Sequence, residues 1–123
     1  MESMEISKIL AETNEKGKFL SCIVTDIEGF PIASVSTADR SPEVQAAVVG
    51  LIQRVISQAS EQLGISDTTE FSLFDASGNL FVCRPFITGG VEMVLAFLIP
   101  GKDQPYRRLM SQTITKIQQF FEL

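Results

Sequence analysis

The sequence holds few of the side chains that usually perform catalysis. It contains no histidine, so the usual general base, the commonest metal ligand and every Ser-His or Cys-His nucleophile pair are missing. Asp26 and Glu28 form a carboxylate pair near a turn, yet two ligands are too few for a calcium loop, and turn chemistry accounts for both. We therefore expect no catalytic residue, no metal site, no cofactor and no enzymatic activity.

The glycine pair and the cysteines point to structure rather than to chemistry. Gly89 and Gly90 lack the GxxxxGK[ST] and GxGxxG contexts of phosphate-binding loops, so a hairpin loop is predicted there. Cys22 and Cys83 lie far apart inside apolar segments. Two reduced, buried thiols are expected, although the sequence alone leaves a disulfide open.

Three arginines suit contact with a nucleotide or with the switch region of a GTPase. Arg54 lies in a long predicted helix, and Arg107 and Arg108 lie near the start of the last one. An arginine finger is an arginine that reaches the nucleotide of a GTPase and stabilises the charge of the transition state. Solvated surface charge is the simpler interpretation of all three.

The composition limits the partners that this chain can have. With 123 residues it fits one domain, residues 1–123. The net charge of −5 argues against nucleic acid, and no apolar run reaches the roughly 18 to 20 residues of a membrane span. Acidic residues near the N-terminus stand where a signal peptide carries bases. A cytoplasmic protein without membrane insertion is expected.

Apolar periodicity and turn residues predict three helices and five strands. The helices are predicted at residues 2–16, 41–63 and 103–123, and the strands at residues 19–25, 32–35, 69–74, 80–84 and 91–99. Ser41 and Pro42 suit a helix start, and Gly64 suits a helix end. Because several strands are apolar on both faces, helices should cover both sides of the sheet. The fold class is α+β, a three-layer α/β/α sandwich with an antiparallel five-stranded sheet.

The long helix is unusually poor in charge. One apolar arc, which we expect to cover the sheet, contains Val44, Val48, Leu51, Ile52, Val55 and Ala59. A stripe of small or neutral polar residues lies beside it and contains Ala46, Gly50, Gln53, Ser57 and Ser60. An exposed helix side usually carries Lys and Glu, but between Glu43 and Glu61 the only charge is Arg54. This second side is therefore expected to be covered as well.

Gly50 in the middle of the helix indicates that another backbone comes close. Either this side is buried within its own domain, or it faces a symmetry mate in a dimer, which we favour because twofold dimers are the commonest assembly. The strand at residues 69–74 would join such a dimer if it is an edge strand. The predicted dimer interface comprises Ala46, Val49, Gly50, Gln53, Ile56, Ser57, Thr69, Phe71 and Leu73, and the predicted partner-binding residues are Arg54, Ser60 and Glu61.

The order of the elements and several local patterns resemble the roadblock family, named for a dynein light chain. The matching features are the hairpin at residues 26–34, Glu43 followed by Ala46 and Ala47, the pair Leu63-Gly64, and the aliphatic strand at residues 91–99 before a helix that begins with arginines. The resemblance implies a roadblock/profilin-like fold and a homodimer or heterodimer without an active site. It also implies a scaffold or regulator of small GTPases, in prokaryotes of the gliding-motility type.

The sequence thus favours a non-enzymatic homodimer that binds a Ras-like small GTPase and modulates its GTP hydrolysis or its localisation. A small-molecule sensor and a general adaptor without a GTPase partner are the alternatives. An enzyme that relies on carboxylates and lysines is the third alternative.

Overall fold

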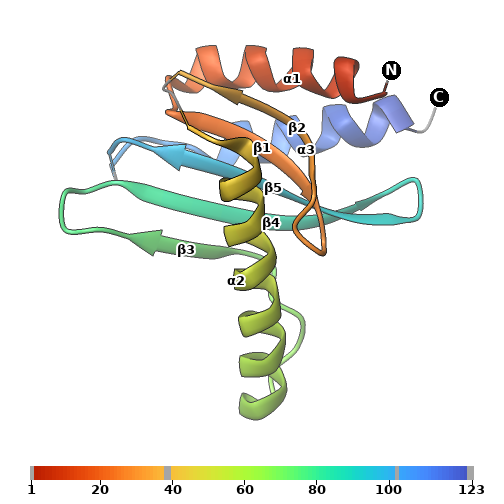
Figure 1. The fold of residues 1–123 in the computed structure, drawn as a ribbon, viewed down its shortest axis with the longest axis vertical. Helices are drawn as coiled ribbons and strands as arrows, with labels where there is room; N and C mark the ends of the chain where they lie inside the picture. Colours follow the sequence, from red (N-terminus) through yellow and green to blue (C-terminus); the bar gives the residue numbers. More distant parts are fainter. Residues whose placement is uncertain (1, 38–39, 102, 122–123) are drawn as a thin grey trace.

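A computed structural model describes residues 2–37, 40–101 and 103–121 and shows one antiparallel sheet between two helical layers (Figure 1). Two helices cover one face, and the long helix crosses the other face (Figure 1). The elements are α1 (Glu2–Gly17), β1 (Ser21–Asp26), β2 (Pro31–Ser36), α2 (Pro42–Leu63), β3 (Phe71–Phe74), β4 (Leu80–Thr88), β5 (Val91–Ile99) and α3 (Arg107–Phe121). The predicted α+β class and three-layer sandwich are confirmed. The predicted helix end at Leu123 lies outside the described residues.

The strands follow the order β2-β1-β5-β4-β3, so β1 and β5 lie inside the sheet and β3 forms one edge. β5 pairs with β1 from Met93 to Leu98 and with β4 along its whole length. Five consecutive residues of β1 and five of β5 are buried, because helices cover both faces. This explains why neither strand alternates between polar and apolar residues.

The sheet separates two hydrophobic clusters. The larger cluster joins α1 and α3 to one face, and Phe19 stacks on Phe97 in it with ring centroids 4.6 Å apart. The smaller cluster joins α2 to the other face through Ala46, Val49 and Ile52. Cys22 lies in the first cluster and Cys83 in the second, and both thiols are buried and free. Since the sheet stands between them, the two cysteines do not form a disulfide with each other.

Four predicted boundaries were wrong by two or more residues. β1 begins at Ser21 rather than at residue 19, and α3 begins at Arg107 rather than at residue 103. β3 begins at Phe71 rather than at residue 69, and β4 continues through Pro85 to Thr88 rather than ending at Arg84. Proline is tolerated in this half of β4 because β3 pairs only with residues 80–83, which leaves one side of the strand open. Gly89 and Gly90, with φ of 57° and 77°, form the short hairpin turn.

The long helix begins and ends where the sequence predicts. The hydroxyl of Ser41 accepts a hydrogen bond from the Val44 amide at 3.3 Å, and Pro42 occupies the first helical turn. Gly64 ends the helix in the left-handed conformation, with φ of 69°. These signals fix the two ends of α2. They do not determine which side of the helix faces the sheet.

Gly50 packs against the hairpin between β1 and β2. A Cβ atom at this position would lie 2.6 Å from the carbonyl oxygen of Glu28 and 2.9 Å from the Cα of Gly29. The close backbone approach predicted at Gly50 is therefore present, but the backbone belongs to the same chain. The assignment of Ala46, Val49 and Gly50 to a dimer interface was wrong, because all three are buried within their own domain.

We expect the substitution Gly50→Ala to lower the free energy of unfolding by about 1–3 kcal/mol, because the added methyl group meets backbone atoms that cannot rotate away. Chemical denaturation measures this change. Gly101→Ala is the matched control, since nothing lies within 4 Å of a Cβ atom there. A stability equal to or above that of the wild type for Gly50→Ala would contradict the close packing.

Candidate functional site

The side of α2 that faces away from the sheet is apolar. Val44, Val48, Leu51 and Val55 are 38% to 63% exposed, whereas Ala46, Val49 and Ile52 are at most 8% exposed. At about 100° per residue, the centres of the two sets lie about 130° apart around the helix. The sequence-based assignment of these four residues to the sheet was therefore wrong, as was that of Ala59, which is also exposed, whereas the assignment of Ile52 is confirmed. Both sides are apolar, and the fit of Gly50 against the hairpin favours the side that turns inward.

The four exposed residues, which we call the apolar stripe, follow one another at intervals of four, three and four residues. This spacing is the heptad pattern by which one helix packs along a second helix. Exposed aliphatic side chains of this size, in one continuous row, are typical of an interaction site. The apolar stripe is thus the part of α2 that is suited to a second protein surface.

The C-terminal half of α2 extends beyond the edge of the sheet. Figure 1 shows the helix crossing the sheet and continuing past β3. No residue of α2 after Ile52 is buried, and Leu63 and Ile65 at its end are 72% and 59% exposed. An isolated helix of this length is only marginally stable in water. The projecting half therefore gains stability if another surface covers it.

The edge strand β3 carries further apolar surface beside the helix. Leu73 and Phe74 are 48% and 64% exposed, and β4 pairs with only one side of the strand. Phe71 packs partly against the smaller core cluster. Thr69, which was expected in the same strand, lies before it and is exposed. Phe71 and Leu73 thus lie on an edge strand, which is the condition that the sequence analysis set for a dimer joined at this strand.

A groove of about 870 Å³ lies between the C-terminal half of α2, the segment that follows it, and the outer half of β4. The three predicted partner-binding residues, Arg54, Ser60 and Glu61, all line it. Gln53, Ile56 and Ser57, which were predicted to contact a second subunit, line the same groove. The structure therefore brings these six residues together on one wall and places the apolar stripe on another side of the helix.

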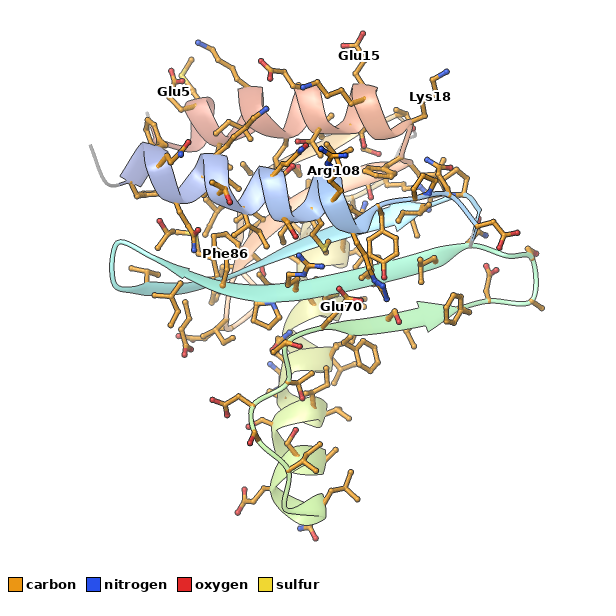
Figure 2. The ribbon with its side chains drawn as sticks, turned by 180° about the vertical axis from the view of Figure 1, so that it is seen from behind. Glu5, Glu15, Lys18, Glu70, Phe86 and Arg108 are labelled. Carbon is orange, nitrogen blue, oxygen red and sulfur yellow. The ribbon has the colours of Figure 1, made fainter. Side chains whose placement is uncertain are left out.

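Glu70, immediately before β3, is the centre of a polar cluster that sequence analysis missed (Figure 2). Its carboxylate accepts hydrogen bonds from Arg84 at 2.9 Å, from the Tyr106 hydroxyl at 3.0 Å and from Arg107 at 3.3 Å. Arg84 also donates to Ser111 at 2.7 Å. These contacts join β3, β4 and α3. No local motif announces them, because the partners lie 14 to 37 residues from Glu70.

The contacts within this cluster shift the pKa values of Glu70 and Tyr106. Partial burial acts to raise the pKa of Glu70, but the hydrogen bonds from Arg84 and Tyr106 and the charges of Arg107 and Arg84 outweigh burial and lower this pKa. Burial and the neighbouring Glu70 carboxylate raise the pKa of Tyr106. Arg107, one of the candidate arginine fingers, is held by Glu70 and lies 5.1 Å from the ring centroid of Tyr106.

Asp26, the first of the two acids in the hairpin, organises its own turn. One carboxylate oxygen accepts hydrogen bonds from the amides of Glu28, Gly29 and Phe30 at 2.9 to 3.0 Å. Among the residues that the structure describes, no group of three or more potential ligands is arranged to hold a metal ion. Within the same described part, no helix is long and apolar enough to span a membrane.

Comparison with solved structures identifies the fold. MglB in a tetrameric arrangement has a TM-score of 0.79 at 13% identity and covers 98% of this chain and 90% of its own. The gliding protein MglB from Thermus thermophilus has a TM-score of 0.78 at 13% identity, with 98% and 91% covered. A roadblock/LC7 domain from Streptomyces avermitilis has a TM-score of 0.73 at 14% identity, with 95% and 98% covered. No protein-family model matches the sequence, and no curated protein is significantly similar to it. The chain therefore has the fold of prokaryotic roadblock domains.

We expect Glu70→Gln to lower the free energy of unfolding by about 1–2 kcal/mol at neutral pH, because the neutral amide binds Arg84 and Arg107 less strongly. A carboxyl whose pKa is lowered on folding stabilises the protein above its ordinary pKa and loses that effect as the pH falls through the lowered value. The difference between wild type and variant should thus shrink below about pH 4.

Urea denaturation across a pH series measures this difference. Glu15→Gln, which removes an exposed carboxylate from α1, is the control. If the stability gap between wild type and Glu70→Gln is independent of pH, the Glu70 carboxylate does not hold the cluster together.

Proposed function

We propose that this chain is a homodimeric, non-enzymatic scaffold or regulator that binds a Ras-like small GTPase and modulates its GTP hydrolysis or its localisation. The observation that carries the proposal is the apolar stripe on a helix whose second half projects beyond its own sheet. A helix that is half covered and apolar on its outer side is suited to protein binding rather than to catalysis.

A twofold arrangement would cover most of this surface. If β3 pairs with β3 of a second copy, the projecting half of α2 lies over the second sheet, and the two long helices run beside each other. The same pairing satisfies the unpaired backbone groups of the β3 edge, which are otherwise an aggregation hazard. A contact built from the same patch on both chains closes on itself and stops at two subunits.

The choice of a small GTPase as the partner rests on the roadblock resemblance in the sequence and on the shared fold of MglB. The side chains available on α2 favour a positional mechanism. Arg54 is exposed and takes part in no ion pair among the described residues, whereas Arg107 is bound to Glu70. Such a regulator would act by holding the switch loops of the GTPase in order, which requires surface complementarity rather than a catalytic residue.

The dimer is expected to depend on the outer side of α2. Val55→Asp places a charge in the apolar stripe and should raise the dissociation constant of the dimer by about tenfold or more. Light scattering coupled to size-exclusion chromatography at micromolar concentration should give the mass of two 13.5 kDa chains for the wild type.

Gln112→Asp introduces the same charge at an exposed position of α3 and serves as the control. A wild-type mass of one chain would refute the dimer. An undiminished dimer in Val55→Asp would remove the apolar stripe from its interface.

GTPase binding is tested with purified Ras-like small GTPases from the same genome, each loaded with GDP or with a non-hydrolysable GTP analogue. We expect one of them to bind in a nucleotide-dependent manner and to change its hydrolysis rate on binding. Arg54→Ala should leave that change within about twofold, since loss of an arginine finger costs on the order of 10³-fold or more. Absence of binding to every GTPase tested would contradict the choice of a small GTPase as the partner.

A further inference from the structure

The groove beside α2 has walls of different chemistry. Its apolar lining comes from Ile27, Ile56, Pro85, Phe86 and Ile87, and hydroxyl groups come from Ser57, Ser60 and Thr68. Four charged residues, Arg54, Glu61, Asp67 and Glu92, complete the lining together with Gln53 and Gln118. All of these residues belong to one chain, so the groove is complete within a single protomer.

The charged residues of the groove are not neutralised by their own chain. Three carboxylates and one guanidinium line the groove, which leaves an excess of negative charge. The ion pairs formed among the described residues join Glu5, Glu12 and Glu70 to their basic partners, and none of them includes Glu61, Asp67 or Glu92. Such a groove attracts a cationic group, and its apolar lining can pack against the alkyl part of that group.

The outer edge of β4 in the groove is closed to strand addition. Pro85 has no amide hydrogen to offer, and the side-chain amide of Gln118 donates to the Ile87 carbonyl at 3.0 Å. An incoming segment would therefore be recognised through its side chains rather than by a continuous ladder of backbone bonds.

The exposure of the lining favours a peptide segment over an enclosed small molecule. Arg54, Ser57, Glu61, Asp67 and Ile87 are all exposed, whereas a small-molecule site usually buries most of its ligand. We propose that this groove is a docking site for an extended segment of a partner protein that presents an arginine or lysine between aliphatic side chains.

The test uses two matched peptides, acetyl-Leu-Arg-Leu-amide and acetyl-Leu-Glu-Leu-amide, added to the full chain labelled with ¹⁵N. We expect the arginine peptide to shift the amide resonances of Ser57, Thr68 and Ile87 saturably below about 10 mM, as weak binding of a short peptide requires. The glutamate peptide should leave these resonances unchanged.

The double variant Glu61→Gln/Asp67→Asn should weaken arginine-peptide binding by about threefold to tenfold, because each exposed ion pair contributes modestly. Glu15 lies on α1, in the helical layer on the other face of the sheet (Figure 2). The control variant Glu15→Gln should therefore leave peptide binding unchanged. The proposal is overturned if the arginine peptide produces no saturable shifts at the groove. Equal responses to both peptides, or equal weakening in Glu15→Gln, would overturn it too, since they indicate non-specific attraction.

Discussion

The contact between Gly50 of α2 and the hairpin between β1 and β2 determines which side of the long helix faces the sheet. Two glycines meet there, and a Cβ atom on Gly29 would lie 3.0 Å from the Cα of Gly50. No other residue type allows the two backbones this close. Once this contact is made, Ala46, Val49 and Ile52 turn inward, and the apolar stripe turns outward. The proposed partner surface is thus a consequence of backbone packing.

In the C-terminal half of α2, no residue after Ile52 is buried. The helix approaches β1 and β2 closely, and its second half leaves the sheet beyond β3. The chain then returns through residues 65–70 to the edge strand, where Glu70 ties the start of β3 to β4 and α3. This polar cluster fixes the position of the edge strand from which a second subunit would continue the sheet.

One helix thereby offers two surfaces of different character. The apolar stripe is aliphatic and has the spacing of a helix-packing surface, whereas the groove on another side mixes apolar lining with carboxylates that form no ion pair among the described residues. Aliphatic surfaces favour permanent association, while charged grooves favour reversible recognition of a complementary segment. A scaffold that both dimerises and binds another protein can use both kinds of surface.

The sequence by itself determined the elements, their order and the three-layer class, because periodicity, caps and turn residues are local signals. Ser41 and Gly64 mark the ends of α2 through their own backbone geometry, and unbroken apolar runs mark strands covered on both faces. Only the tertiary structure decided which apolar side of α2 faces inward, where Arg54, Ser60 and Glu61 gather, and that Glu70 has three partners. Those facts depend on contacts between residues far apart in the chain. A helical wheel is equally consistent with either side turning inward until a second backbone fixes its rotation.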